Sequence, residues 1–164
     1  MATTVGARSA DDLWDGYAAD YLACAKSRAK VLASPDVRIL LERGLHRGTD
    51  VHAALDMCHH VPPEWVVGAI SVIYERLLST HFFLDAFRVL STCIPKNVVE
   101  AFFDSKVEEI VNEEHASSIT LFFSFCSSTV PRVARRLAEV CLGSPSIDIR
   151  EHGESFLSQL NDPQ

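Results

Sequence analysis

Four cysteines recur along this chain at a nearly constant interval. Cys24, Cys58, Cys93 and Cys126 are separated by 34, 35 and 33 residues. A repeated interval of this length is typical of stacked helical hairpins, in which each repeat is one supersecondary unit. The interval therefore predicts an architecture and says little by itself about chemistry.

Prolines divide the chain into segments with helical periodicity. They stand where a helix is expected to begin, because proline is favoured in the first helical turn. The boundaries are Pro35, Pro62–Pro63, Pro95 and Pro131. Between them apolar residues recur every three or four positions, and no stretch alternates apolar and polar residues between hairpin turns as a strand would. The pattern predicts an all-α fold.

We expect about nine helices, arranged as four divergent hairpins plus a C-terminal helix. The approximate ranges are 9–31, 35–48, 49–61, 63–77, 82–94, 95–110, 117–130, 131–142 and 146–160. At 164 residues the chain is long enough for one domain. We therefore predict a flexible segment over residues 1–8 and a single helical domain over residues 9–161.

The pairing of cysteine-bearing helices with proline-opened helices resembles α-solenoids of the HEAT or armadillo kind. The resemblance covers helix pairing and approximate period only. Each of the four cysteines precedes the next proline boundary by 11, 4, 2 or 5 residues, so the two markers do not keep register. This drift indicates divergent hairpins, and either a short solenoid or a compact superhelical bundle fits the pattern.

The overall charge bears on which partners are expected. The chain has 15 basic and 22 acidic residues, a net charge of −7, which disfavours binding to nucleic acid or to an anionic membrane. No apolar run approaches the ~20 residues of a membrane-spanning helix, and Met1–Ala10 lacks the apolar core of a secretory signal. We expect a cytoplasmic or nuclear protein. All five cysteines are interpreted as core thiols, since none forms a C-x-x-C pair.

One helical segment carries residues that could bind a metal ion. His52, Asp56 and His59 are spaced i, i+4 and i+7, which places two imidazoles and a carboxylate along one side of a helix. The other side is apolar, so we interpret the three residues as a solvated face and expect no metal or cofactor. Cys58 and His59 are neighbours that point about 100° apart, which disfavours a nucleophile–base pair between them.

Eight of the nine phenylalanines lie between Phe82 and Phe125. Aromatic residues at helical spacing usually belong to the core, so we predict that most of them are buried. The alternative is an aromatic groove for a ligand or peptide.

Four glutamates cluster near the expected end of the 95–110 helix: Glu108, Glu109, Glu113 and Glu114. They are interpreted as a solvated turn, and the alternative is a docking patch for a basic partner.

No catalytic motif occurs in the sequence, so we do not expect an enzyme. We predict an adaptor or scaffold module that binds a peptide or helix of another protein. Its expected aromatic anchors are Trp14, Tyr17 and Trp65, because aromatic side chains concentrate binding energy. Basic residues gather on the second helices at both ends, and they would recognise an acidic or phosphorylated segment: Arg38, Arg43, Arg47, Arg132, Arg135 and Arg136. The alternative is a structural subunit that self-associates or completes a larger helical complex.

Overall fold

The structure is a computed structural model that describes residues 31–46, 51–113 and 115–161. Every regular element within these ranges is a helix, which confirms the all-α prediction. The nine helices are α2 (Pro35–His46), α3 (Val51–Met57), α4 (Pro63–Gly68), α5 (Ile70–Leu77), α6 (Phe83–Thr92), α7 (Lys96–Asn112), α8 (Ala116–Thr129), α9 (Pro131–Leu142) and α10 (Ile147–Asn161). The expected segment 1–8 and helix 9–31 fall almost wholly outside the described residues.

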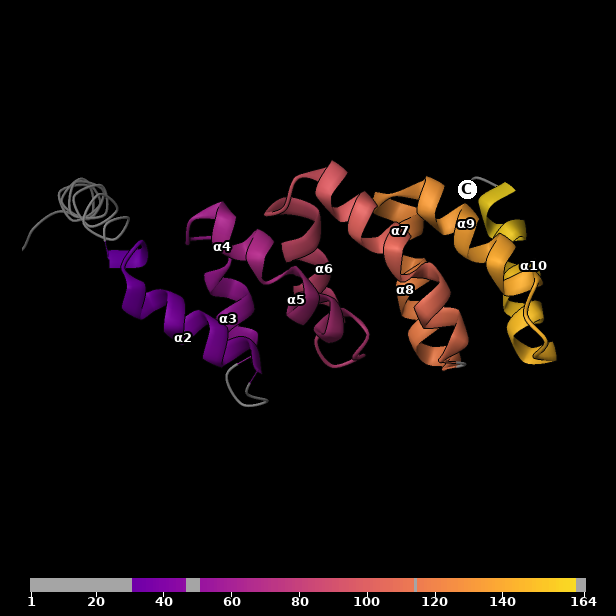
Figure 1. Ribbon diagram of the computed structural model, residues 1–164, viewed down its shortest axis with the longest axis horizontal. Coiled ribbons are helices and arrows are strands. Elements are labelled where there is room, and N and C mark those ends of the chain that lie inside the picture. Colours follow the sequence, from indigo (N-terminus) through magenta and orange to yellow (C-terminus); the bar gives the residue numbers. More distant parts are fainter. Residues whose placement is uncertain (1–30, 47–50, 114, 162–164) are drawn as a thin grey trace, which may run out of the picture.

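The helices follow one another along a row, with α2 at one end and α10 at the other (Figure 1). Sequence neighbours pack together along this row: α2 with α3, α5 with α6, α8 with α9, and α9 with α10. Helices further apart in the sequence also touch, namely α3 with α6, α7 with α9, and α8 with α10. None of the helices within the described ranges has the length and apolar character that a membrane crossing requires.

Proline marks four of the nine helix starts in the described ranges, as predicted. Helices α2, α4 and α9 begin at Pro35, Pro63 and Pro131, and Pro95 immediately precedes α7. The single helix expected over 63–77 is wrong, because the chain leaves helical geometry at Ala69, with φ −97° and ψ 7°. Gly68 comes directly before this break, and glycine costs a helix about 1 kcal/mol relative to alanine. Two short helices, α4 and α5, result.

Aromatic rings fill the middle of the row. Of the eight phenylalanines between Phe82 and Phe125, four are buried and four are half-buried against the core, so the prediction that most are buried is confirmed only in part. Phe103, Phe122 and Phe125 are fully buried. The rings of Phe103 and Phe125 stack with centroids 4.6 Å apart, and Tyr74 meets Phe103 edge-on at 5.5 Å. These contacts join α5, α7 and α8, and such aromatic pairs add to the stabilisation that burial provides.

Close backbone approach distinguishes the C-terminal pair, α9 and α10. A Cβ built on Gly153 would lie 2.9 Å from the carbonyl oxygen of Ala138 and 3.0 Å from the Cβ of Cys141. Nearby, the rings of Phe123 and Phe156 stack almost parallel, 4.0 Å apart. Only glycine fits at position 153 without a shift of the neighbouring helix.

The cysteines do not all lie in the core. Cys58, Cys126 and Cys141 are buried, as predicted, but Cys93 is only half-buried. Cys93 packs against the core without being enclosed by it, so its interpretation as a core thiol holds only in part. The reason is its position: Cys93 caps the C-terminal end of α6 and faces the end of α3, where the packing opens toward solvent. Cys24 lies outside the described residues.

Candidate partner-binding groove

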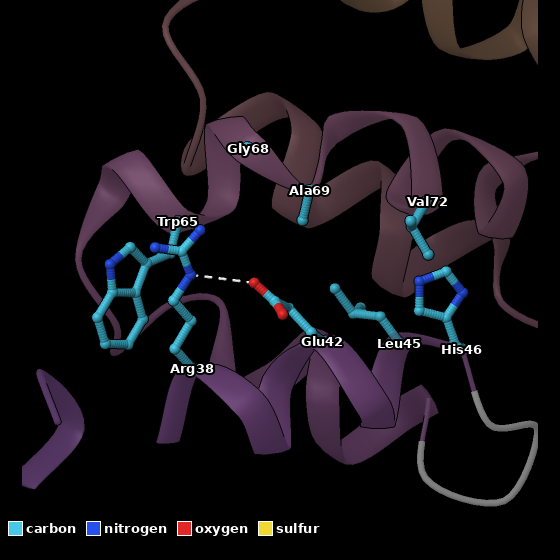
Figure 2. A pocket seen from close by; sticks show the side chains of 8 residues that line it. All are labelled: Arg38, Glu42, Leu45, His46, Trp65, Gly68, Ala69 and Val72. Carbon is cyan, nitrogen blue, oxygen red and sulfur yellow. Dashed lines mark hydrogen bonds and ion pairs between the residues drawn. The ribbon is translucent and has the colours of Figure 1, made fainter. Parts of the chain in front are cut away.

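A groove of about 230 Å³ lies between α2 and the α4–α5 pair (Figure 2). We call it the α2–α5 groove, and its lining residues are Arg38, Glu42, Leu45, His46, Trp65, Gly68, Ala69 and Val72. Figure 2 shows Ala69 and Val72 pointing from the α4–α5 side toward Leu45 and His46 on α2. The groove thus has an apolar floor between two helices.

Charged side chains form the rim of the α2–α5 groove. The Nε of Arg38 donates a hydrogen bond to Oε1 of Glu42 at 3.0 Å, and both side chains are more than half exposed. The guanidinium carbon of Arg38 lies 6.0 Å from the centroid of the Trp65 ring, within the range of a cation–π contact. Trp65 itself is half-buried, so part of its indole remains available to a ligand.

An arginine fixes the width of the groove at one end. The Nε of Arg76 on α5 donates to the carbonyl oxygen of Leu45 at 2.9 Å, and its Nη2 donates to the carbonyl oxygen of His46 at 3.4 Å. The last carbonyls of a helix have no partner within the helix, and a basic side chain satisfies them well. Arg76 therefore ties the C-terminal end of α2 to α5.

The residues considered as metal ligands lie against α6. We call the line of polar contacts between α3 and α6 the α3–α6 seam. Its contacts are His52 Nδ1 to Asp85 Oδ2 at 2.6 Å, Asp56 to Arg88 at 3.6 Å and His59 Nδ1 to Cys93 Sγ at 3.1 Å. His52 and Asp56 are exposed, as expected for a solvated face, and the packing of α6 beside α3 also gives each of the three residues a partner. Within the described ranges, no three His, Cys, Asp or Glu side chains are placed to share a metal ion.

Two of the three arginines predicted on the 131–142 helix, Arg132 and Arg136, contact α7. Arg132 lies 3.7 Å from Glu100. Arg136 is held more closely, at 2.8 Å from Oδ2 of Asp104 and 2.7 Å from Oε1 of Glu108, and it donates to the carbonyl oxygen of Asp104 at 2.9 Å. Hydrogen bonds to the two carboxylates raise the pKa of Arg136 further above its ordinary value, so its guanidinium stays charged. We call this line of contacts the α7–α9 seam.

The structure separates the predicted site residues. Trp65 lies in the α2–α5 groove, whereas α9, which carries Arg132, Arg135 and Arg136, lies toward the other end of the row (Figure 1). Arg135 donates to Oδ1 of Asn161 at 3.3 Å. Trp14 and Tyr17 lie outside the described residues. A role for the three arginines in binding an acidic partner stays a prediction.

The sequence did not single out Glu42, His46, Ala69 or Val72 as site residues. The i, i+4 spacing of Arg38 and Glu42 was a usable signal for one wall of the α2–α5 groove.

Comparison with known proteins found no matching family model, no similar curated protein and no similar solved structure.

Proposed function

We propose that this protein is a non-catalytic adaptor or scaffold module, with a HEAT- or armadillo-like arrangement of hairpins, and that the α2–α5 groove binds a peptide or helix of a partner protein. The observation that supports the proposal is the groove itself. It combines a half-buried tryptophan, an apolar floor and a charged rim on a helical frame. Protein interfaces are built this way, with aromatic anchors at the centre and polar groups around them.

The size of the groove favours a protein partner. Pockets for small organic ligands usually span about 300–1,000 Å³. The α2–α5 groove, at about 230 Å³, instead suits one or two side chains that project from a longer segment. Such a segment continues along the surface on either side of the groove, where the exposed rim can contact it.

The lining defines the chemistry of the bound segment. Leu45, Ala69 and Val72 offer apolar contact to a Leu, Met or Phe side chain. Arg38 favours a carboxylate beside that anchor, because its guanidinium is exposed and can form a bidentate pair. We therefore propose a partner segment with one large apolar residue flanked by an acidic residue.

Selection from a displayed library of random peptides, followed by measurement of Kd, tests this proposal. Gly68 offers a way to fill the groove, since a Cβ there meets no atom within 4 Å. We expect Gly68→Trp and Trp65→Ala each to weaken binding of the selected peptides by about 30-fold or more, the effect of losing a central anchor. Gly143→Trp is the matched control at a distant exposed glycine, and it should leave Kd unchanged.

Two outcomes would overturn the proposal. One is that no peptide with an apolar anchor is enriched over the library. The other is that the selected peptides bind equally well to the wild-type protein, the Gly68→Trp variant and the Trp65→Ala variant. Thermal unfolding of each variant checks that a lost interaction is not a lost fold.

A second candidate function rests on a different observation. Three large apolar side chains at the α2 end of the row are exposed: Val31 at 61%, Ile39 at 47% and Leu40 at 59%. Exposed apolar patches of this kind often mark contacts between chains. The protein would then be a structural component that self-associates through this end. Light scattering at increasing concentration should show a dimer that Leu40→Lys abolishes and Ile147→Lys, at the far end, does not. A monomer at every concentration contradicts this candidate.

A further inference from the structure

Cys93 differs from the other cysteines that the structure describes. Burial raises the pKa of the Cys58 thiol to about 12 and that of Cys141 to about 11, and it raises the pKa of Cys126 further still. These three stay protonated at neutral pH, and the thiolate is the nucleophilic form. Cys93 is half-buried, and its Sγ lies 3.1 Å from Nδ1 of His59 across the α3–α6 seam.

Arg88 fixes which nitrogen of the His59 ring carries the proton. The Nε of Arg88 donates to Nε2 of His59 at 3.3 Å. A guanidinium has donors and no acceptor, so Nε2 must be the unprotonated nitrogen. Partial burial and the charge of Arg88 both lower the pKa of His59 below 6.5, which keeps the ring neutral at pH 7. The single ring proton therefore lies on Nδ1, and Nδ1–H donates to Sγ of Cys93.

This arrangement prepares the sulfur for reaction. A thiolate accepts hydrogen bonds more strongly than a thiol, so the bond from Nδ1 strengthens as the sulfur loses its proton. A hydrogen-bond donor fixed beside a thiol favours its thiolate, which is the nucleophilic form. Here His59 supplies the donor, and Arg88 holds the ring in the tautomer that points the proton at Cys93.

We propose that Cys93 is a site of reversible modification by thiol–disulfide exchange with a low-molecular-mass disulfide of the glutathione type. The Cys93 thiol gives its proton to solvent, and the thiolate attacks one sulfur of the disulfide. A bond forms between Sγ and that sulfur while the original S–S bond breaks, and the departing thiolate takes up a proton. Cys93 is oxidised to a mixed disulfide, and one half of the reagent is reduced to a free thiol.

The adduct would act on the packing of the helices. Cys93 caps α6 and touches His59 in the turn that follows α3, so a bulky group on Sγ must displace the ring. The modification would thereby loosen the α3–α6 seam, and a reducing thiol would restore it.

Mass spectrometry after exposure to oxidised glutathione tests the proposal. We would use the full chain as a Cys24→Ser variant, at pH 7.5, and map the adduct by peptide analysis. The expected result is one glutathione on Cys93, none on Cys58, Cys126 or Cys141, and full reversal by dithiothreitol. Modification of the three buried cysteines but not Cys93 would overturn the proposal.

The role of His59 is tested by the rate of modification. His59→Phe keeps an aromatic ring and removes the N–H donor, and we expect it to slow modification of Cys93 about tenfold, the effect of one hydrogen bond to a charged group. His60→Phe, a change at the exposed neighbouring histidine, is the matched control and should leave the rate unchanged. Equal rates in the wild-type protein and His59→Phe would contradict the assigned arrangement, as would equal slowing by His60→Phe. Circular dichroism verifies that both variants fold.

Discussion

The two seams join helices in the same way but with different chemistry. In both, side chains 28 to 34 residues apart meet across a pair of helices that are not consecutive in the sequence. The α3–α6 seam uses histidine and cysteine along with carboxylates and an arginine. The α7–α9 seam uses arginines, carboxylates and one backbone carbonyl. Equivalent packing thus leaves one part of the row sensitive to protons and thiol reagents and the other sensitive mainly to salt.

Two glycines, one toward each end of the row, also differ in their surroundings. Gly153 in α10 lies against the backbone of α9, whereas Gly68 in α4 borders open space in the α2–α5 groove. Helices α9 and α10 are therefore close-packed at Gly153, whereas the surface at Gly68 leaves room for a ligand. The predictions below test this difference.

The largest expected effect comes from adding one methyl group at Gly153, with the same change at Gly68 as the comparison. Gly153→Ala should lower the free energy of unfolding by about 1–3 kcal/mol, because the new Cβ would overlap the carbonyl oxygen of Ala138 and force α9 and α10 apart. Gly68→Ala should raise it by about 0.5 kcal/mol or less, because alanine favours a helix and nothing obstructs it. Urea unfolding followed by circular dichroism measures both. Equal changes in the two variants would remove the contrast between the ends of the row.

Much of this fold could be predicted from the sequence because its determinants are local. Pro35, Pro63 and Pro131 act through their own backbone geometry, so they mark helix starts regardless of what packs around them. The break at Ala69 was not predicted, since the apolar periodicity of the segment runs through it. Helix pairing of the HEAT or armadillo kind stays a prediction.

The seams and the groove could not be predicted, because they depend on which helices lie side by side. His59 and Cys93 are 34 residues apart, and only the packing of α6 on α3 brings them together. The burial of Cys58 could be predicted from the apolar periodicity of its own segment, and it is confirmed. The sequence therefore indicated that Cys58 and Cys93 are one interval apart, but it could not show that one is buried and the other faces a histidine.

A smaller effect is expected from removing one arginine from each seam. Arg136→Met loses three contacts of 2.7–2.9 Å and leaves Asp104 and Glu108 as a like-charge i, i+4 pair on α7. Arg88→Met loses contacts of 3.3 and 3.6 Å. We expect Arg136→Met to lower the unfolding temperature more than Arg88→Met, and both less than Gly153→Ala. In about 1 M NaCl the difference between the two arginine variants should shrink, because salt screens exposed charges. A larger drop in unfolding temperature for Arg88→Met than for Arg136→Met would contradict the expected order of the two seams.

The smallest effect concerns the response of the α3–α6 seam to acid. Partial burial, followed by the charge of Arg88, lowers the pKa of His59 in the folded protein below the ordinary value of 6.5. The unfolded chain therefore binds a proton at a higher pH than the folded chain does. His59 should make the protein less stable as pH falls through 6.5, and its effect should level off once the folded ring is also protonated. We expect urea unfolding at pH 7.5, 6.5 and 5.5 to show a steeper loss of stability in the wild-type protein than in His59→Asn. Parallel pH profiles would mean that His59 has the same pKa in the folded and unfolded protein. That result would contradict the assignment of a neutral ring whose Nδ1–H donates to Cys93.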